Sequence, residues 1–337
     1  MIIRSKAPLR LGLAGGGTDV SPYSDMFGGT VLNATINLSA YCTIEPLDQP
    51  VLRVSAADAG IRAVVPLGSP SGAPLIDGVY NRVVKDFGPV PSAGFAITTY
   101  NDAPAGSGLG TSSTMVVCIL KCFAEWMGLP LGDYELARLA YEIERKDLAL
   151  AGGKQDQYAA AFGGFNFMEF LPSDMVIVNP LRVKDWIVAE LEGSMVLYFT
   201  GRSRFGGDII AQQQKAAQDG SAVAIEAMHR IKQSTLDMKL ALLQGDMTAF
   251  ARILGWAWEE KKKMADAITN PMIQEAFDVA LGAGAISGKV SGAGGGGFMM
   301  LMVNPTRRME VIEALQALPG KVVPFQFTDK GAVAWKL

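Results

Sequence analysis

A loop dense in glycine and hydroxyl residues precedes the clearest helical pattern in the chain. Small residues there would let a ligand approach the backbone, and the following helix would present unpaired N–H groups and the positive end of its dipole. Such groups bind phosphate, and neighbouring hydroxyls can bind phosphate oxygens or Mg²⁺. A tight turn with an ordinary helix cap is the alternative, but the density of glycine and serine favours phosphate. The candidate residues are Pro104, Gly106, Ser107, Gly108, Leu109, Gly110, Thr111, Ser112 and Ser113.

Two common phosphate-binding motifs do not fit the other glycine segments. A P-loop needs the pattern GxxxxGK[ST], but the Gly288–Lys289 pair is followed by Val290. The GxGxxG spacing of a dinucleotide-binding fold occurs within residues 292–297, but a strand-like run follows it where that fold requires a helix. Neither motif is present, so a phosphate site at the loop 104–113 would belong to another class.

Composition places the chain among globular proteins with an ample core. Of 337 residues, 49% are hydrophobic and 19% charged, and the formal net charge is −3. A sequence-independent nucleic-acid binder needs a basic surplus, so nucleic acid is excluded as a partner. One histidine excludes a His-rich metal site, and three cysteines without CxxC spacing predict reduced core thiols. No apolar run reaches the roughly 18 residues that span a bilayer, so we expect no membrane contact and a cytoplasmic location.

Hydrophobic periodicity and the positions of glycine and proline predict alternating strands and helices. The expected strands are 2–14, strand pairs within 30–46 and 51–65, then 94–100, 195–200, 289–290, 298–303, 322–327 and 332–336. The expected helices are 74–87, 111–127, 133–149, 155–163, 271–283, 306–318, and a pair within 208–266 that breaks at Gly245-Asp246. We expect two domains, 1–180 and 181–337.

Three glycine segments, in this order, resemble the motifs of the GHMP kinase superfamily, which includes galactokinases, homoserine kinases and mevalonate kinases. Motif one, residues 7–19, resembles APGRxNLIGEHTD, and motif two, residues 104–113, resembles PxxxGLGSSA with Thr111 and Ser113 as mild departures. Motif three is residues 289–297. AGGGTD at 14–19, GGKQDQYAA at 152–160 and TGRSR at 200–204 are most similar to the heptose 7-phosphate kinase branch and its fucose-type relatives. Galactokinases carry Glu-His where this chain has Gly16-Gly17.

The resemblance implies an α+β fold with a ribosomal S5 domain 2-like N-terminal domain and a ferredoxin-like C-terminal domain. ATP and a sugar phosphate would meet between them, with Mg²⁺ as the metal. The implied reaction phosphorylates the anomeric hydroxyl of D-glycero-D-manno-heptose 7-phosphate to the 1,7-bisphosphate. A kinase for a neutral sugar such as fucose or galactose, and a non-catalytic sugar and ATP sensor, are the alternatives. Whether the chain forms a homodimer is left open.

The resemblance also assigns roles to individual residues. Asp156 would be the base for the acceptor hydroxyl, and Arg10 would stabilise charge on the transferring phosphoryl group. Ser112 and Glu144 would hold Mg²⁺. The alternatives are a helix cap for Asp156, a surface position for Arg10 and a solvated helix face for Glu144. The wall around the sugar would be formed by Gly16, Gly17, Thr18, Asp19, Gly294 and Gly295.

A phosphorylated substrate requires cations at the far end of the sugar site. Lys154, Arg202 and Arg204 are the candidates, because each interrupts a glycine- or serine-containing loop. The basic run 261–263 lies on a predicted long helix, where it is more typical of a solvated face.

Overall fold

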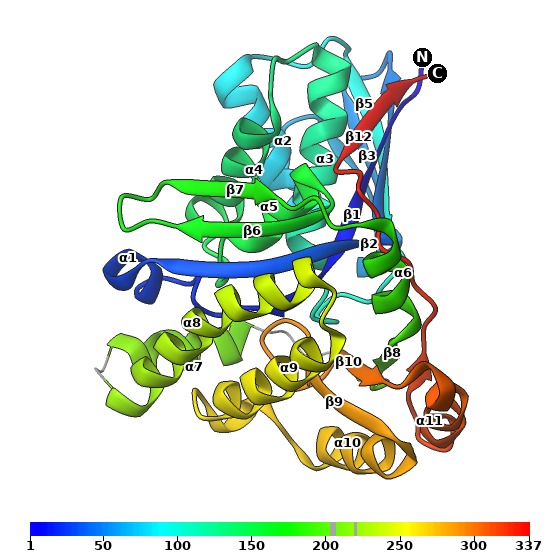
Figure 1. Ribbon diagram of the computed structural model, residues 1–337. Helices are drawn as coiled ribbons and strands as arrows, with labels where there is room; N and C mark the ends of the chain where they lie inside the picture. Colours follow the sequence, from blue (N-terminus) through cyan, green and yellow to red (C-terminus); the bar gives the residue numbers. More distant parts are fainter. Residues whose placement is uncertain (203–206, 219–220) are drawn as a thin grey trace.

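Two β-sheets and the helices that cover them build the protein (Figure 1). The computed structural model describes residues 1–202, 207–218 and 221–337. The first sheet has eight strands in this part of the chain. Its order is β12 (Val333–Lys336), β1 (Ile3–Ala14), β2 (Gly29–Leu47), β5 (Gly94–Asn101), β3 (Val51–Ala56) and β4 (Ile61–Pro66), with β6 (Phe165–Phe170) and β7 (Val176–Pro180) continuing from β2.

The strand β2 corrects the prediction of a strand pair within 30–46. It is one long strand that pairs with β1 along most of its length, with β6 through residues 29–34 and with β5 through residues 40–47. The segment holds no glycine or proline between Thr30 and Glu45 that could reverse the chain. One strand therefore changes partners, and residues 51–65 form the expected pair, β3 with β4.

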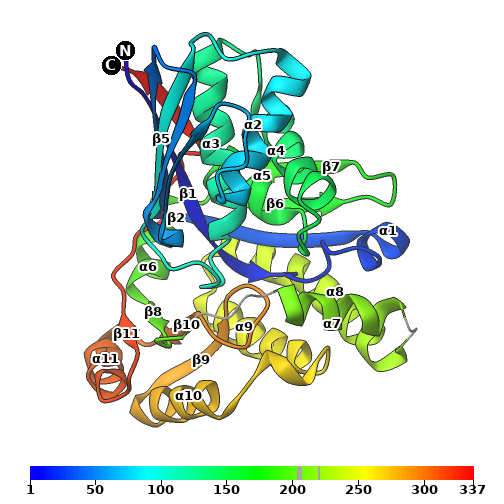
Figure 2. The same cartoon turned by 180° about the vertical axis from the view of Figure 1, so that it is seen from behind.

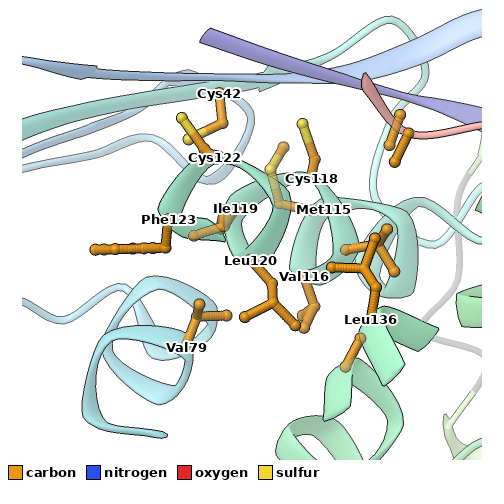
Figure 3. Close-up of a cluster of buried hydrophobic side chains, with 14 of the residues drawn as sticks. Cys42, Val79, Met115, Val116, Cys118, Ile119, Leu120, Cys122, Phe123 and Leu136 are labelled. Carbon is orange, nitrogen blue, oxygen red and sulfur yellow. The ribbon is translucent and has the colours of Figure 1, made fainter. Parts of the chain in front are cut away.

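Helices of the first half cover one face of this sheet. They are α2 (Pro74–Phe87), α3 (Thr111–Met127), α4 (Asp133–Glu142), the π-helical turn η2 (Ile143–Asp147) and α5 (Gln155–Phe162). Figure 3 shows α3 between the sheet and α2, with Cys122 turned towards Cys42 of β2 and Cys118 turned towards the strands. Burial raises the pKa of the Cys118 thiol to about 12, which agrees with the prediction of unreactive core thiols.

The second sheet runs in the order β11 (Lys321–Val322), β8 (Met195–Phe199), β10 (Phe298–Val303) and β9 (Ala285–Val290). The predicted helix pair is α8 (Ala222–Gln244) and α9 (Met247–Lys262), separated by Gly245 at φ 73° and capped by Asp246, which accepts from Ala249 N–H. Because α8 contacts β1 and β2 while α9 contacts β9, the pair joins the two sheets (Figures 1 and 2). The remaining helices are α1 (Tyr23–Phe27), α6 (Asp185–Gly193), α7 (Gly207–Gln218), α10 (Pro271–Ala283), α11 (Arg308–Gln316) and the 3₁₀ turns η1 (Ala57–Ala59), η3 (Asp266–Ile268) and η4 (Pro305–Arg307).

The last strand returns to the first sheet, which brings the two termini together (Figure 1). Ile3 pairs with Lys336 across the β1–β12 edge. The predicted two-sheet α+β architecture is confirmed. The division into two domains at residue 180 stays a proposal, and β12, from the second half of the chain, pairs with β1 in the first sheet. No helix in the described part of the chain combines the length and the apolar character needed to cross a membrane.

Candidate active site

A cavity of about 1050 Å³ lies where the three glycine motifs converge. Residues of β1, motif two, the segment 144–156, α9 and motif three line it. Ligand sites usually have volumes of about 300 to 1,000 Å³, so this cavity has room for more than one small ligand. The convergence of segments that are far apart in the sequence agrees with the predicted cleft.

Motifs two and three touch through their glycines. Gly108 has φ +82°, and a Cβ placed on it would lie 2.4 Å from the Ser291 carbonyl oxygen. The Ser291 hydroxyl donates to the Gly108 carbonyl at 2.9 Å, and Phe298 N–H donates to the Ser107 carbonyl at 2.9 Å. The glycine clusters therefore reflect close backbone contact between two walls of the cavity, and only glycine fits at position 108.

Most of the predicted phosphate loop lines the cavity. The lining residues from it are Pro104, Gly106, Gly108, Gly110, Thr111, Ser112 and Ser113. Ser107 and Leu109 do not line it: both are fully buried, and Leu109 belongs to the core against α6, β8 and α9. The side chains of these two residues therefore face the core, and their place in the nucleotide-binding loop stays a prediction.

Arg10 and Asp156 form an ion pair at the centre of the cavity wall. The Arg10 Nε and Nη2 atoms lie 2.7 and 2.6 Å from Asp156 Oδ1, and Nη1 donates to the Gly108 carbonyl at 2.5 Å. Arg10 is 4% exposed and the Asp156 side chain 21%. The cap of α5 is Lys154, so Asp156 lies in the first turn and is not the helix cap. A Cβ on Gly110 would lie 3.1 Å from Asp156 Cγ, so the carboxylate rests directly against motif two.

Asp19 is a second carboxylate in the cavity wall. It is 1% exposed and accepts hydrogen bonds from the backbone N–H groups of Gly17, Lys154 and Gln155 at 3.2, 3.0 and 3.1 Å. Burial raises the pKa of Asp19, and the neighbouring charge of Asp156 raises it further. A Cβ on Gly153 would lie 1.9 Å from Asp19 Oδ2, so glycine is required for this contact.

The residues before Asp19 divide into two groups. Gly16 and Gly17 line the cavity, as expected for the sugar wall. Thr18 does not: its hydroxyl donates to the carbonyls of Gly15 and Thr30 at 2.8 and 2.9 Å, and the side chain is fully buried. This corrects the expectation for Thr18, which stabilises the turn that carries Asp19.

Ser112 and Glu144 meet at the side of the cavity. The Ser112 hydroxyl donates to Glu144 Oε1 at 3.2 Å, and Gln157 Nε2 donates to Oε2 at 2.5 Å. Glu144 is 1% exposed and belongs to the π-helical turn η2, a distortion often found at functional sites. Oxygen donors of this kind suit Mg²⁺, which commonly binds one or two protein groups, phosphate oxygens and water. The described residues contain no cluster of three or more His, Cys, Asp or Glu that could hold a metal alone.

Lys154 and Arg202, two of the cations expected to bind the substrate phosphate, are not among the described residues that line the cavity. The Lys154 ammonium pairs with Asp174 at 2.5 Å and lies 3.9 Å from Asp25, which corrects its predicted role. Arg202 is exposed, and its backbone carbonyl accepts from Gly297 N–H at 2.9 Å. Arg204 lies outside the described residues.

Motif three contributes alternate glycines to the cavity. Gly294 lines it, whereas Gly295 donates its N–H to the Ile268 carbonyl at 2.8 Å and does not. The expectation for Gly295 is therefore corrected, and it anchors the loop to η3. Gly292 and Gly296, which were not selected from the sequence, line the cavity instead.

Two lysines of the cavity wall were missed. Lys261 is 4% exposed, and its ammonium donates to the Gly292 carbonyl, so the prediction of a solvated face for this residue is wrong. Burial lowers the pKa of Lys261 to about 8, and the Arg10 charge adds to this effect. Lys289 donates to the carbonyls of Gly12 and Leu13 at 2.9 and 3.4 Å, and burial lowers its pKa well below the usual value.

A signal for Lys261 was present in the helical period. Leu254, Ala257 and Trp258 precede it by seven, four and three residues, and all three are buried. Their positions place Lys261 on the inner face of α9, whereas Lys262 pairs with Glu259 at 2.7 Å on the outside.

Gln155 was also missed as a site residue, although the adjacent Lys154 and Asp156 were predicted from the sequence. It lines the cavity and is 8% exposed. Its Oε1 atom is buried and has no hydrogen-bond partner in the described residues. An unsatisfied buried acceptor at a cavity wall is typical of a group that binds a ligand donor.

The cavity continues into an apolar end. No aromatic side chain is among its described lining residues. The apolar residues of this end come from β3, β4, the start of α2 and the first half of α3: Ala56, Ile61, Ala73, Pro74, Leu75, Ile76, Met115 and Ile119.

Comparison with known proteins agrees with this geometry. Residues 74–164 match the GHMP kinases N terminal domain, and residues 238–320 match the GHMP kinases C terminal domain. The chain is 47% identical over 339 residues to D-glycero-alpha-D-manno-heptose 7-phosphate kinase from Campylobacter jejuni, covering 99% of each protein. It is 29% identical over 370 residues to L-fucokinase/L-fucose-1-P guanylyltransferase from Bacteroides fragilis, covering 98% of this chain and 38% of that protein.

Solved structures show the same relationship. The crystal structure of a D-glycero-D-manno-heptose 1-phosphate kinase from Bacteroides thetaiotaomicron is 61% identical, with a TM-score of 0.85 and 99% of each chain covered. A mevalonate kinase structure at 17% identity shares the fold, with a TM-score of 0.74 over 98% of this chain and 100% of that one. On sequence, motifs and fold together, the chain belongs to the GHMP kinase family.

Proposed function

We propose that the protein transfers the γ-phosphoryl group of ATP to the anomeric hydroxyl of D-glycero-D-manno-heptose 7-phosphate, producing the 1,7-bisphosphate and ADP. The observation that carries this proposal is the Arg10–Asp156 pair, which rests against motif two inside the shared cavity. The identity to the Campylobacter heptose 7-phosphate kinase over nearly the whole chain supports the substrate. The relative from Bacteroides thetaiotaomicron is named a heptose 1-phosphate kinase, whereas the relative from Campylobacter jejuni is named a heptose 7-phosphate kinase. Both sugar phosphates therefore belong in the assay.

The triphosphate of ATP would lie along motif two. The glycines there expose backbone N–H groups, and the start of α3 provides the positive end of a helix dipole. The adenine would occupy the apolar end of the cavity, between β3, β4 and α2. The acceptor sugar would lie on the other side of the ion pair, where Asp19 and Gln155 can bind its hydroxyls.

Asp156 would accept the proton of the anomeric hydroxyl as its oxygen bonds to the γ-phosphorus. The bond from that phosphorus to the bridging oxygen breaks, and ADP leaves with the electron pair. Arg10 keeps the carboxylate in place through two contacts to Oδ1 and lies beside the charge that develops on the phosphoryl group. Mg²⁺, when bound by Ser112 and Glu144, would neutralise charge on the phosphates.

Glu144→Gln is expected to raise the Mg²⁺ concentration needed for half-maximal rate about tenfold or more, because an amide is a weaker ligand for Mg²⁺ than a carboxylate. A Mg²⁺ titration of the initial rate at saturating ATP measures this. Glu135→Gln, an exposed change in the first turn of α4, is the control and leaves the titration unchanged. Identical Mg²⁺ curves for wild type and Glu144→Gln would remove Glu144 from the metal site.

An ATP-consumption assay with a panel of acceptors tests the function itself. The panel contains heptose 7-phosphate, heptose 1-phosphate, unphosphorylated heptose, fucose and galactose. We expect the highest kcat/KM with heptose 7-phosphate. A preference for a neutral sugar would replace the proposal with a neutral-sugar kinase, and absence of turnover with every acceptor would favour a sensor.

A further inference from the structure

Lys261 is a buried cation whose hydrogen-bonding capacity is only partly used. Its ammonium carries three N–H donors, and the structure shows one acceptor for it, the Gly292 carbonyl. In the described part of the chain no carboxylate lies within the 4 Å of an ion pair, although the charge of Asp19 acts on it from farther away. A buried charge without a partner of opposite sign is costly, so such an ammonium at a cavity wall calls for an anionic ligand.

The position of this ammonium is defined by a chain of contacts. Gly292, which accepts from Lys261, packs against Gly108: a Cβ on Gly292 would lie 2.7 Å from Gly108 Cα. The Gly108 carbonyl in turn accepts from Arg10, which holds Asp156. Lys261 therefore lies on the motif-three side of the cavity, next to its contact with motif two and close to the groups that take part in the reaction.

The other cations of the cavity are already engaged. Lys289 donates to two carbonyls at the end of β1. Arg10 directs two nitrogens to Asp156 and the third to Gly108. Arg145 donates to the carbonyls of residues 150, 151 and 153. Lys261 is the cation of this wall with the most donor capacity left for a ligand.

We propose that Lys261 binds the transferring phosphoryl group from the motif-three side of the cavity and is a catalytic residue of the reaction. This inference rests on the proposed function. Lys261 stays protonated throughout: Asp156 takes the proton of the acceptor hydroxyl, the new O–P bond forms, and the bond to ADP breaks. The ammonium stabilises the negative charge on the equatorial oxygens while the phosphoryl group passes between donor and acceptor.

The test is Lys261→Met, which keeps the length of the side chain and removes its charge. We expect kcat to fall about 100-fold or more with heptose 7-phosphate and by the same factor with unphosphorylated heptose, because the lost contact is to the group transferred in both reactions. KM for the sugar phosphate is expected to change less than about threefold. Lys262→Met, on the outer face of the same helix, is the matched control and keeps the wild-type kcat.

A binding measurement separates the roles without turnover. Calorimetry with ADP, aluminium fluoride and heptose 7-phosphate forms a complex that imitates the phosphoryl group in transit. Lys261→Met is expected to weaken this complex about tenfold or more and to leave binding of ADP alone unchanged, and Lys261→Arg to restore part of the affinity. Circular dichroism and thermal melting establish whether the variants are folded. If Lys261→Met does not fold, both assays are carried out with Lys261→Arg alone.

Three outcomes overturn the inference. A rise in KM for heptose 7-phosphate with kcat unchanged would assign Lys261 to the phosphate already on the sugar. If Lys261→Met weakened binding of ADP alone as much as binding of the aluminium fluoride complex, Lys261 would be assigned to the other phosphates of the donor. Unchanged kinetics in folded variants would make Lys261 a structural residue. Failure of the proposed function is distinct, because the wild-type enzyme would then not turn over heptose 7-phosphate at all.

Discussion

Asp156→Asn is expected to lower kcat with heptose 7-phosphate about 1,000-fold or more. The asparagine amide has nearly the same shape but cannot take the proton of the anomeric hydroxyl, and a positioned general base contributes about 10²- to 10⁴-fold. Its Oδ1 atom can still accept from Arg10 Nε, which lies 2.7 Å from the carboxylate oxygen, so the cavity wall is retained. Binding of ATP and sugar phosphate, measured by calorimetry, is expected to change little.

The matched control is Asp185→Asn, a change at an exposed aspartate in the first turn of α6 that is not among the residues lining the cavity. It should retain the wild-type kcat in the same coupled assay. Phosphoryl transfer by Asp156→Asn at the full rate would contradict the role of Asp156 as base. A loss of ATP binding in that variant would instead show that the pair with Arg10 mainly supports motif two.

Gly108→Ala is expected to lower kcat/KM about 100-fold or more. The new Cβ would lie 2.4 Å from the Ser291 carbonyl oxygen, and the residue would have to keep φ +82°, which alanine rarely adopts. Motifs two and three must then move apart, and a displacement of about 1 Å in a positioning group can cost about 100-fold in rate. Steady-state kinetics and thermal melting measure the two consequences.

Gly128→Ala is the control that separates the strain of a positive φ from the steric clash expected in Gly108→Ala. Gly128 ends α3 at φ +68°, but a Cβ there meets nothing within 4 Å. Its expected effect is a loss of about 1 kcal/mol of stability with unchanged kinetics. If both glycine variants kept the wild-type kcat/KM, close contact between the two motifs would not be needed for catalysis.

Local sequence was sufficient for the elements with a strong pattern of their own. The helix 111–127 was predicted to its observed ends, because its apolar face repeats at helical spacing and Gly128 and Pro130 follow it. The strand 2–14 and the helix break at 245–246 were also recovered. The segment 30–46 was not, because a strand that exchanges one neighbour for another carries no local signal of the exchange.

The side-chain directions of two lysines escaped the same reasoning. Lys154 comes from a glycine-rich loop of the site, yet its ammonium turns away to Asp174 at the β6–β7 turn. Lys261 was assigned to solvent with its neighbours, yet it turns inward to Gly292. Their partners lie 20 and 31 residues away, so the composition of the loop could not reveal the direction of Lys154, whereas the helical period alone carried a signal for Lys261.

The sequence by itself determined the family, the α+β fold class and the residues of the central pair, because glycine-rich phosphate loops and a carboxylate at a helix start are contiguous patterns. Only the tertiary structure decided which of those residues face the ligands, and it added Gln155, Lys261 and Lys289 to the cavity wall. The physical reason is that a cavity is formed by the packing of distant segments. The environment of a charged group therefore depends on contacts that only the folded chain brings together.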